Sequence, residues 1–245
     1  AADAYFVEVA LQSLAQMAPG SIVSENPERH VAYEVIDPYG VEVTALDEHG
    51  IELAHFVVGR GTPDGRAFYI RYPFDGTDVM LIRRNVRDAF DRYGNGPGAW
   101  RDKTLFKAES RAIERIEITN RDERIEIKRV VPSAGATSDQ DDWVGTRPMV
   151  GTVERMVGNA MTSNLADLRA DQFHDGDQTP AGLGLEPPRV RIDAHLADGT
   201  TLSLEVGNEV NNRLYVRRPG DAEIAMVPVF KLHNFLRSSG ELIKH

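Results

Sequence analysis

Seven histidines are the first residues to weigh for chemistry, because histidine serves most often in acid–base catalysis and in metal binding. Their spacing favours neither role. His49 and His195 fall in or just before predicted hairpin turns, and His55 lies on a strand edge without a second ligand two residues later. We interpret all of them as structural or surface residues; they are His30, His49, His55, His174, His195, His233 and His245.

Two acidic groups superficially resemble calcium-binding loops. Neither has the spacing of an EF-hand, and neither supplies the terminal bidentate Glu. The sequence therefore predicts no metal site and no cofactor. The two groups are Asp171, Asp175 and Asp177, and Asp139, Asp141 and Asp142.

The glycine-rich stretches do not form a nucleotide-binding fingerprint. Gly59-x-Gly61 and Gly94-x-Gly96-x-Gly98 lack the strand-to-helix context of that motif, so we interpret them as turns. The chain also lacks the G-x-S-x-G, Walker A and H-E-x-x-H motifs. It has no cysteine, which excludes disulfides, Cys-ligated zinc and thiol catalysis. The sequence predicts a protein without catalytic residues, and so not an enzyme.

Two Tyr-x-Arg tripeptides are the best candidates for a partner-binding surface. The two-residue period of a strand places Tyr69 with Arg71, and Tyr215 with Arg217, on one face of each strand. Tyr and Arg are enriched among the residues that anchor protein interfaces. The alternative is a solvent-exposed face on which each Arg packs over its Tyr. Replacement of Tyr215 and Arg217 by Ala would test the interface hypothesis.

The charge of the chain argues against a nucleic-acid partner. Its net charge is −10, with a pI near 5.2, whereas binding to a phosphate backbone needs a concentrated Lys and Arg face. No apolar run approaches the ~20 residues that a membrane-spanning helix needs. The sequence begins with Ala-Ala-Asp rather than Met, so we expect a processed product or an excised fragment from which any targeting segment has been removed.

The elements that would position these side chains occur twice in the same order. Residues 41–71 read as strand, turn, strand, glycine and Tyr-x-Arg, and residues 189–217 repeat that order. Similarity spread over helices, turns and strands predicts an internal duplication. Further matched pairs are Gly50 with Gly199, Gly59 with Gly207, Ile36-Asp37-Pro38 with Leu185-Glu186-Pro187, and strand 79–82 with strand 224–227.

Each predicted copy contains one amphipathic helix and ends with a short helix. Apolar residues in 3–17 and in 153–168 recur at spacings of three and four, which places them on one helical face. Asp3 is the predicted N-cap of the first helix. The short helices are predicted over residues 86–93, capped by Asn85, and over residues 229–236.

A hairpin over residues 113–130 opens the second copy only, and residues 133–142 after it are predicted to form a surface loop. Either an upstream hairpin has been removed from the first copy, or the hairpin present pairs with both copies. Regular alternation commits one face to a core and the other to solvent. The predicted core side chains are Ile113, Ile116, Ile118, Ile125, Ile127 and Val130, and the predicted solvent-exposed ones are Arg115, Glu117, Arg124, Glu126 and Lys128.

The economical fold for such a chain is α+β. We expect a tandem duplication in which each copy is an antiparallel β-sheet with amphipathic helices packed on one face. Residues 1–106 would form the first repeat, without its opening hairpin. Residues 107–245 would form the second repeat, which includes the hairpin 113–130.

Trp100-Arg101-Asp102-Lys103-Thr104-Leu105-Phe106, followed by the hairpin 113–130, resembles the bacterial family known as domain of unknown function 4340. Residues 182–188, the Asp198-Gly199 turn and Tyr215-Val216-Arg217 match as well, so the resemblance covers nearly the whole chain as two tandem copies. It implies a transmembrane helix followed by an extracytoplasmic region. It also implies, from many members, an association with an ABC-type transport system. The family has no assigned catalytic residues, so the resemblance assigns none here.

We therefore expect a non-catalytic accessory or binding module on the extracytoplasmic or periplasmic face, anchored by an N-terminal transmembrane helix that is missing from this chain. The expected partners are the permease or the gliding-motility-like auxiliary proteins of an ABC-type transporter. One alternative is an enzyme or small-ligand-binding protein with a site in the cleft between the repeats. Another is a structural assembly protein whose sheet edges pair between chains.

Overall fold

The computed structural model describes residues 1–18, 20–73, 76–91, 97–130 and 142–244, and the chain divides into two compact units, Ala1–Asp102 and Lys103–His245. The sequence placed the boundary slightly later, after residue 106. Leu105 and Phe106 belong to the second unit because their backbone N–H groups both donate to the Leu168 carbonyl, at 2.9 and 3.1 Å, and their side chains join its core.

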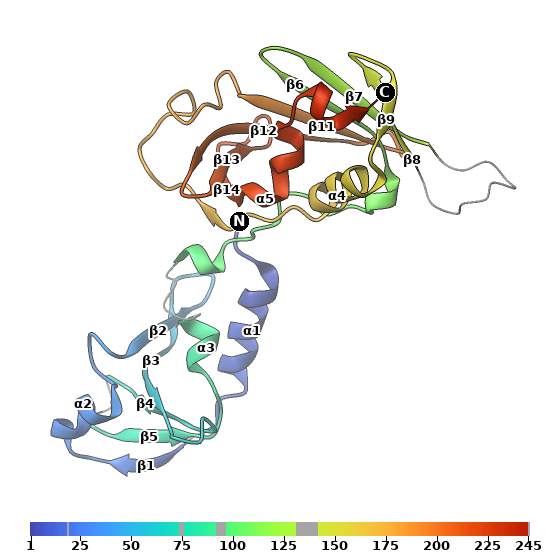
Figure 1. Cartoon of the computed structure of the whole chain (residues 1–245). Coiled ribbons are helices and arrows are strands. Elements are labelled where there is room, and N and C mark those ends of the chain that lie inside the picture. The colour runs from blue at the N-terminus through green and yellow to red at the C-terminus, as the bar shows by residue number, and fades with distance from the viewer. Residues whose placement is uncertain (19, 74–75, 92–96, 131–141, 245) are drawn as a thin grey trace, which may run out of the picture. The chain divides into compact units, whose positions relative to one another are not determined.

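The first unit is built on a five-stranded antiparallel sheet in the order β1-β5-β4-β3-β2 (Figure 1). The register of β3 against β4 shifts between Val58 and Gly61, at a β-bulge that includes Gly59. The strands are β1 (Ser21–Ser24), β2 (Val41–Leu46), β3 (Glu52–Gly61), β4 (Phe68–Arg71) and β5 (Val79–Ile82).

Helix α1 (Ala4–Ala15) confirms the first predicted amphipathic helix, and the Asp3 carboxylate caps it by accepting a hydrogen bond from the Tyr5 N–H at 3.1 Å. The last predicted helix of this unit is shorter than expected, because α3 spans only Arg87–Phe90; part of the predicted span lies outside the described residues. The sequence did not predict α2 (His30–Tyr33). The other helical segments are the 3₁₀ turns η1 (Pro27–Arg29) and η3 (Pro97–Trp100).

The second unit is built on a ten-stranded sheet in the order β10-β14-β13-β12-β11-β6-β7-β8-β9-β15. Strands β11 and β6 are antiparallel neighbours that join two halves of five strands each. The strands are β6 (Ile113–Asn120), β7 (Arg124–Val130), β8 (Asp142–Arg147), β9 (Gly151–Val153), β10 (Gln172–Phe173), β11 (Val190–Leu196), β12 (Thr201–Val210), β13 (Arg213–Arg217), β14 (Ala225–Pro228) and β15 (Ile243–Lys244).

The predicted hairpin 113–130 is confirmed as β6 and β7, and its five isoleucines are fully buried. Val130 was wrongly placed in the core: it ends β7 and is 44% exposed. The prediction that this hairpin pairs with both copies of the repeated unit is also wrong. Strand β6 lies between β11 and β7, and β7 lies between β6 and β8, so both edges of the hairpin are used within the second unit.

Helix α4 (Arg155–Ala166) is the second predicted amphipathic helix, although Val153 lies in β9 instead. Strand β8 begins at Asp142, where a loop was predicted. The Trp143 side chain of β8 packs directly against α4, because Gly158 has no Cβ to meet its ring. The remaining helical segments are η4 (Ser110–Ala112), α5 (Val229–Leu232), η5 (His233–Leu236) and α6 (Ser239–Leu242).

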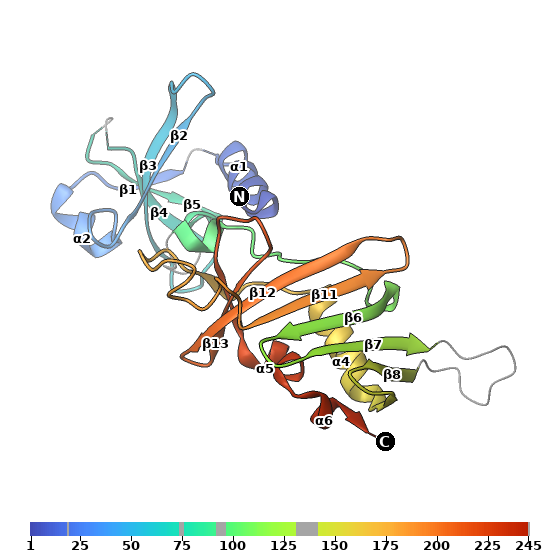
Figure 2. The same ribbon diagram turned by 90° about the horizontal axis from the view of Figure 1, so that it is seen from above.

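Figure 2 shows α4 and α5 on the same side of the large sheet, and the core of the second unit lies between that side and the helices. Two antiparallel sheets accompanied by a few helices make the chain α+β, as the sequence predicted. Among the described residues, none of the helices is long and apolar enough to cross a membrane.

Candidate functional site

The first Tyr-x-Arg pair lies on β4, on the face opposite the buried Phe68 and Ile70. Tyr69 packs against Tyr33, with 4.5 Å between the ring centroids. The Arg71 Nε donates a hydrogen bond to the Val35 carbonyl at 3.1 Å. Both side chains therefore fasten the segment that follows α2 to the sheet.

The second pair lies on β13 in the equivalent setting. Tyr215 packs beside the buried Leu183 and Leu185. The Arg217 guanidinium donates to the Glu205 carboxylate of β12 at 2.8 Å and to the Glu186 carboxylate of the adjoining loop at 3.0 Å. Burial lowers the pKa of Arg217, but the hydrogen bonds to the two carboxylates outweigh it and raise the pKa above its usual value.

Each pair therefore holds a loop against the sheet of its own unit. The predicted common face of Tyr and Arg is confirmed by the burial pattern of β4 and β13. The predicted role of Tyr69, Arg71, Tyr215 and Arg217 as a partner surface stays a prediction.

Two glycines allow these loops to approach their sheets. A Cβ on Gly59 would lie 2.1 Å from the Tyr33 carbonyl oxygen, and a Cβ on Gly207 would lie 2.3 Å from the Leu183 carbonyl oxygen. No side chain fits such a gap between two backbones. The same loops carry the cis peptide bonds Asp37-Pro38 and Glu186-Pro187.

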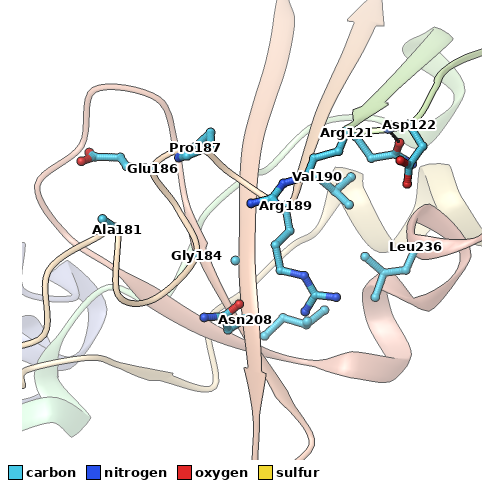
Figure 3. A pocket seen from close by; sticks show the side chains of 13 residues that line it. Arg121, Asp122, Ala181, Gly184, Glu186, Pro187, Arg189, Val190, Asn208 and Leu236 are labelled. Carbon is cyan, nitrogen blue, oxygen red and sulfur yellow. Dashed lines mark hydrogen bonds between the residues drawn. The ribbon is translucent and has the colours of Figure 1, made fainter.

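A pocket of about 570 Å³ opens in the second unit beside the Gly207 loop contact. Five segments of the chain meet there: the β6–β7 turn, the loop that leads into β11, the bulged part of β12, β13 at Leu214 and η5 at Leu236. Figure 3 shows the Arg189 side chain extending between Asn208 and Leu236. The lining residues are Asn120, Arg121, Asp122, Ala181, Gly184, Glu186, Pro187, Arg189, Val190, Gly207, Asn208, Leu214 and Leu236.

Several charged side chains of this pocket have no ion-pair partner among the described residues. Among the residues that the structure describes, the guanidinium groups of Arg121 and Arg189 have neither an ion pair nor a hydrogen bond, and the Asp122 carboxylate is also unpaired. Glu186 is already bound to Arg217, and its side chain points away from Arg189 in Figure 3. The pocket therefore presents two free cationic groups and one free anionic group.

A cluster of charged side chains lies on the face of the large sheet that was predicted to be solvent-exposed. Contrary to that prediction, Glu117 and Glu126 are only 7% and 9% exposed. Arg115 contacts both carboxylates, and it covers them together with Arg124 and Lys128. Alternation in the sequence indicated the correct face, but not the layer of long basic side chains that shields the carboxylates.

The pKa values in this cluster are displaced away from neutrality. The hydrogen bond from the Thr146 hydroxyl is the main reason that the pKa of Glu126 falls from 4.5 to about 2, and Arg115 and Lys128 lower it further against the effect of burial. Burial raises the pKa of Glu117, but Arg124 and Arg115 outweigh it, so that this pKa also lies below its usual value. Both groups are fixed as carboxylates at neutral pH.

The histidines do not assemble a metal site among the described residues, since no group of three suitable ligands occurs there. His30 contacts the Thr77 carbonyl at 2.8 Å, and His55 contacts the Glu42 carboxylate at 2.6 Å. His195 lies 3.2 Å from Glu117, at the edge of the charged cluster. Three of the acidic and histidine residues considered as possible ligands, Asp139, Asp141 and His245, lie outside the described residues.

Sequence reasoning did not single out Arg121, Arg189 or Asn208, the polar residues of the pocket. Each lies in or beside a turn or bulge, where a single arginine or asparagine is ordinary. For Arg189 and Asn208 the available signal was their position next to Pro187 and Gly207, which recur in both halves of the chain; Arg121 had no such signal.

One family model, described as "Domain of unknown function (DUF4340)", matches residues 1–183. No curated protein and no solved structure matches the chain.

Proposed function

The chain belongs to the DUF4340 family, whose function is unknown, and we propose that it is a non-catalytic binding module that holds a small organic anion in the pocket of its second unit. The observation that carries this proposal is the pair of unpaired guanidinium groups, Arg121 and Arg189, in one pocket of the described part of the chain. Both side chains are exposed and solvated in the free chain, and a bound carboxylate or phosphate would replace that water with charge-assisted hydrogen bonds.

The composition of the pocket supports a ligand with a charged end and an apolar part. Arg121 and Arg189 offer forked donors that suit a carboxylate or a phosphate. Val190, Leu214 and Leu236 supply an apolar lining, and Asn208 adds an amide. A volume of about 570 Å³ falls within the range of small-molecule sites. The two guanidinium groups and the Asp122 carboxylate together leave one net positive charge in the pocket, and this charge favours a monoanion.

The electrostatics of the described residues support binding rather than catalysis. A general acid or base needs a pKa near the working pH, which for a carboxyl group means an upward displacement. The shifted carboxyl groups here, among them Glu117, Glu126 and Asp193, all have lowered pKa values, and the shifted arginines have raised ones. Such shifts keep each group in its ordinary charged state, as in structural ion pairs.

The anion site can be tested by nuclear magnetic resonance on the whole ¹⁵N-labelled chain, with 3-methylbutanoate as the probe. We expect shifts at the Asn208 side-chain amide and at the backbone N–H groups of Gly184 and Gly207. Arg189→Gln should weaken binding about tenfold or more, since a charge-assisted hydrogen bond contributes roughly 1.5–3 kcal/mol. The matched control is Arg111→Gln, at the opposite end of β6.

Two outcomes would contradict the anion site. One is equal binding of the neutral amide of the same acid, which would show that the charge is not recognised. The other is an equal loss of affinity in the Arg111→Gln control, which would locate binding elsewhere.

We also propose that this module works on the extracytoplasmic face, in a membrane-anchored protein associated with an ABC-type transporter. The support is the family resemblance alone, because members of the family typically carry a transmembrane helix before an extracytoplasmic region. Fractionation of the native host and protease treatment of intact cells would test the placement. Affinity capture after cross-linking should recover permease or auxiliary subunits, and their absence would contradict the transporter association.

We propose, finally, that the two units descend from one duplicated sequence. Two features support this: the five strands of the first sheet have the same order as β10-β14-β13-β12-β11 in the second, and each unit has a glycine, Gly59 or Gly207, beneath a closely approaching loop. Sequences of diverse family members give the test. If separate alignments of residues 1–102 and 103–245 showed no mutual similarity beyond chance, the duplication would be contradicted.

A further inference from the structure

Strand β2 forms an edge of the first sheet that has no strand partner among the described residues. Its counterpart by strand order, β11, is not an edge, because β6 pairs along it from Val190 to Leu196. The β6–β7 hairpin cannot also pair with β2, because both of its edges are already paired within the second unit. An exposed strand edge presents unpaired N–H and C=O groups that another strand can bind.

The edge of β2 lacks two of the residues that usually prevent such pairing, and the one register shift against β3 lies near its end, between Ala45 and Leu46. Its sequence, Val-Glu-Val-Thr-Ala-Leu, contains neither Pro nor Lys. Leu46, Ile51 and Leu53, at the tip of the β2–β3 hairpin, are 58%, 61% and 69% exposed. Val43 is only partly buried, whereas its counterpart Ile192 on β11 is fully buried. The apolar side chains near this edge are therefore less buried than one would expect of a strand that is paired on both sides.

The second unit shows how the strand that corresponds to β2 is paired. Its ten-stranded sheet consists of two five-stranded halves joined by antiparallel pairing of β11 with β6. Ile192 lies opposite Ile118 across that junction, with both side chains on the core face. Two five-stranded sheets of the first unit, joined through β2, would give the same number and order of antiparallel neighbours.

We propose that β2 is a homodimerisation surface, at which β2 of one copy pairs antiparallel with β2 of a second copy around a two-fold axis. The register places Val43 opposite Val43 of the second copy, and Val41 opposite Ala45. The apolar side chains of both copies then share one face, as the two-residue period requires. A symmetric pair uses the same edge of both copies and so leaves no β2 edge for a third copy.

The charges on the other face are compatible with this register. Glu42 and Thr44 are the exposed residues of β2 between its ends, and each Glu42 lies opposite Thr44 of the second copy. Like charges would destabilise the pairing only if they stood directly opposite each other. Glu42 also contacts His55 of its own hairpin, at 2.6 Å, so it keeps a partner within its own chain.

The test combines a measurement of the molecular mass in solution with cross-linking, both on the full chain. Sedimentation equilibrium should show a concentration-dependent species of twice the monomer mass of 27.2 kDa. Because the chain has no cysteine, Thr44→Cys introduces a single thiol, and a short bis-maleimide should join two copies through it. Thr201→Cys, at an exposed position on β12, is the matched control and should stay uncoupled.

Two charge variants test the register. Thr44→Glu should weaken the dimer about 3- to 10-fold, because it places a second carboxylate opposite Glu42 of the other copy, and Thr44→Lys should strengthen it by a similar factor. Circular dichroism and thermal unfolding of both variants check that the fold is intact. A chain that remains monomeric at high concentration, or a dimer in which Thr44→Cys does not couple, would overturn the proposal. Protection of the thiol in the Thr44→Cys variant by another protein, without self-association, would do the same.

Discussion

The Arg217 guanidinium donates to the Glu205 carboxylate at 2.8 Å, and each of these side chains is only 13% exposed. Strand register places Glu205 opposite Arg217 and, in the first unit, Val57 opposite Arg71. The two Tyr-x-Arg strands therefore hold their loops by different means: a carboxylate pair in the second unit, and a backbone carbonyl in the first.

Replacement of Arg217 by Ala should destabilise the chain. The change leaves Glu205 largely buried without its cation, and we expect a loss of about 2 kcal/mol in the free energy of unfolding, less than for a fully buried pair. Arg71→Ala should cost less, about 1 kcal/mol, because no carboxylate lies opposite it. Urea unfolding measures both, and a larger loss for Arg71→Ala would contradict this account.

Acid should destabilise the chain through Glu126. Its pKa is held near 2, below the value of 4.5 for a free carboxyl group. A lowered pKa contributes stability that is complete above pH 4.5 and is lost as the pH falls through that range toward 2. Between about pH 6 and about pH 3 we expect Glu126→Gln to reduce the pH dependence of unfolding by about 1–2 kcal/mol.

A second variant, Thr146→Val, tests the same source of acid sensitivity. Thr146→Val removes the hydroxyl that does most to lower the pKa of Glu126, so it should reduce the acid sensitivity in part. Unchanged acid sensitivity in both variants would show that other carboxylates dominate.

Gly158 should not accept a side chain. A Cβ there would lie 2.3 Å from the Trp143 ring, and we expect Gly158→Ala to cost about 1–3 kcal/mol through overpacking, despite the better helix propensity of Ala. Near-UV circular dichroism should report the displaced tryptophan. Gly240→Ala in α6 is the control, because its Cβ would meet nothing within 4 Å; equal losses would contradict the packing argument.

Gly207→Ala should disturb both the fold and the pocket. Its Cβ would lie 2.3 Å from the Leu183 carbonyl oxygen, and a backbone oxygen cannot move without shifting the loop that lines the pocket. We expect a loss of about 1–3 kcal/mol and weaker binding of 3-methylbutanoate. Gly182→Ala, whose nearest neighbour would be at 3.4 Å, should retain both properties; if Gly207→Ala also retained them, the close approach would not matter.

Local periodicity predicted much of the fold. The isoleucines of the hairpin 113–130 and the apolar face of α1 follow from alternation and from helical spacing, which depend only on neighbouring residues. Strand β8 was missed, because it follows a polar stretch that indicates a loop. Val130 was misplaced because it is out of phase with Ile125 and Ile127: the two-residue period puts it on the same face as Lys128.

The sequence by itself determined the α+β class, the hairpins, the capped helix and the family, because each depends on short patterns of residue type. Only the tertiary structure decided which strands are neighbours, and so which side chains meet. The burial of Glu117 and Glu126 depends on arginines from adjacent positions across the hairpin. The pocket depends on Arg121, Arg189 and Asn208, which come together because β6 pairs with β11 and β12 follows it in the sheet. No local pattern encodes pairing between segments so far apart in the chain.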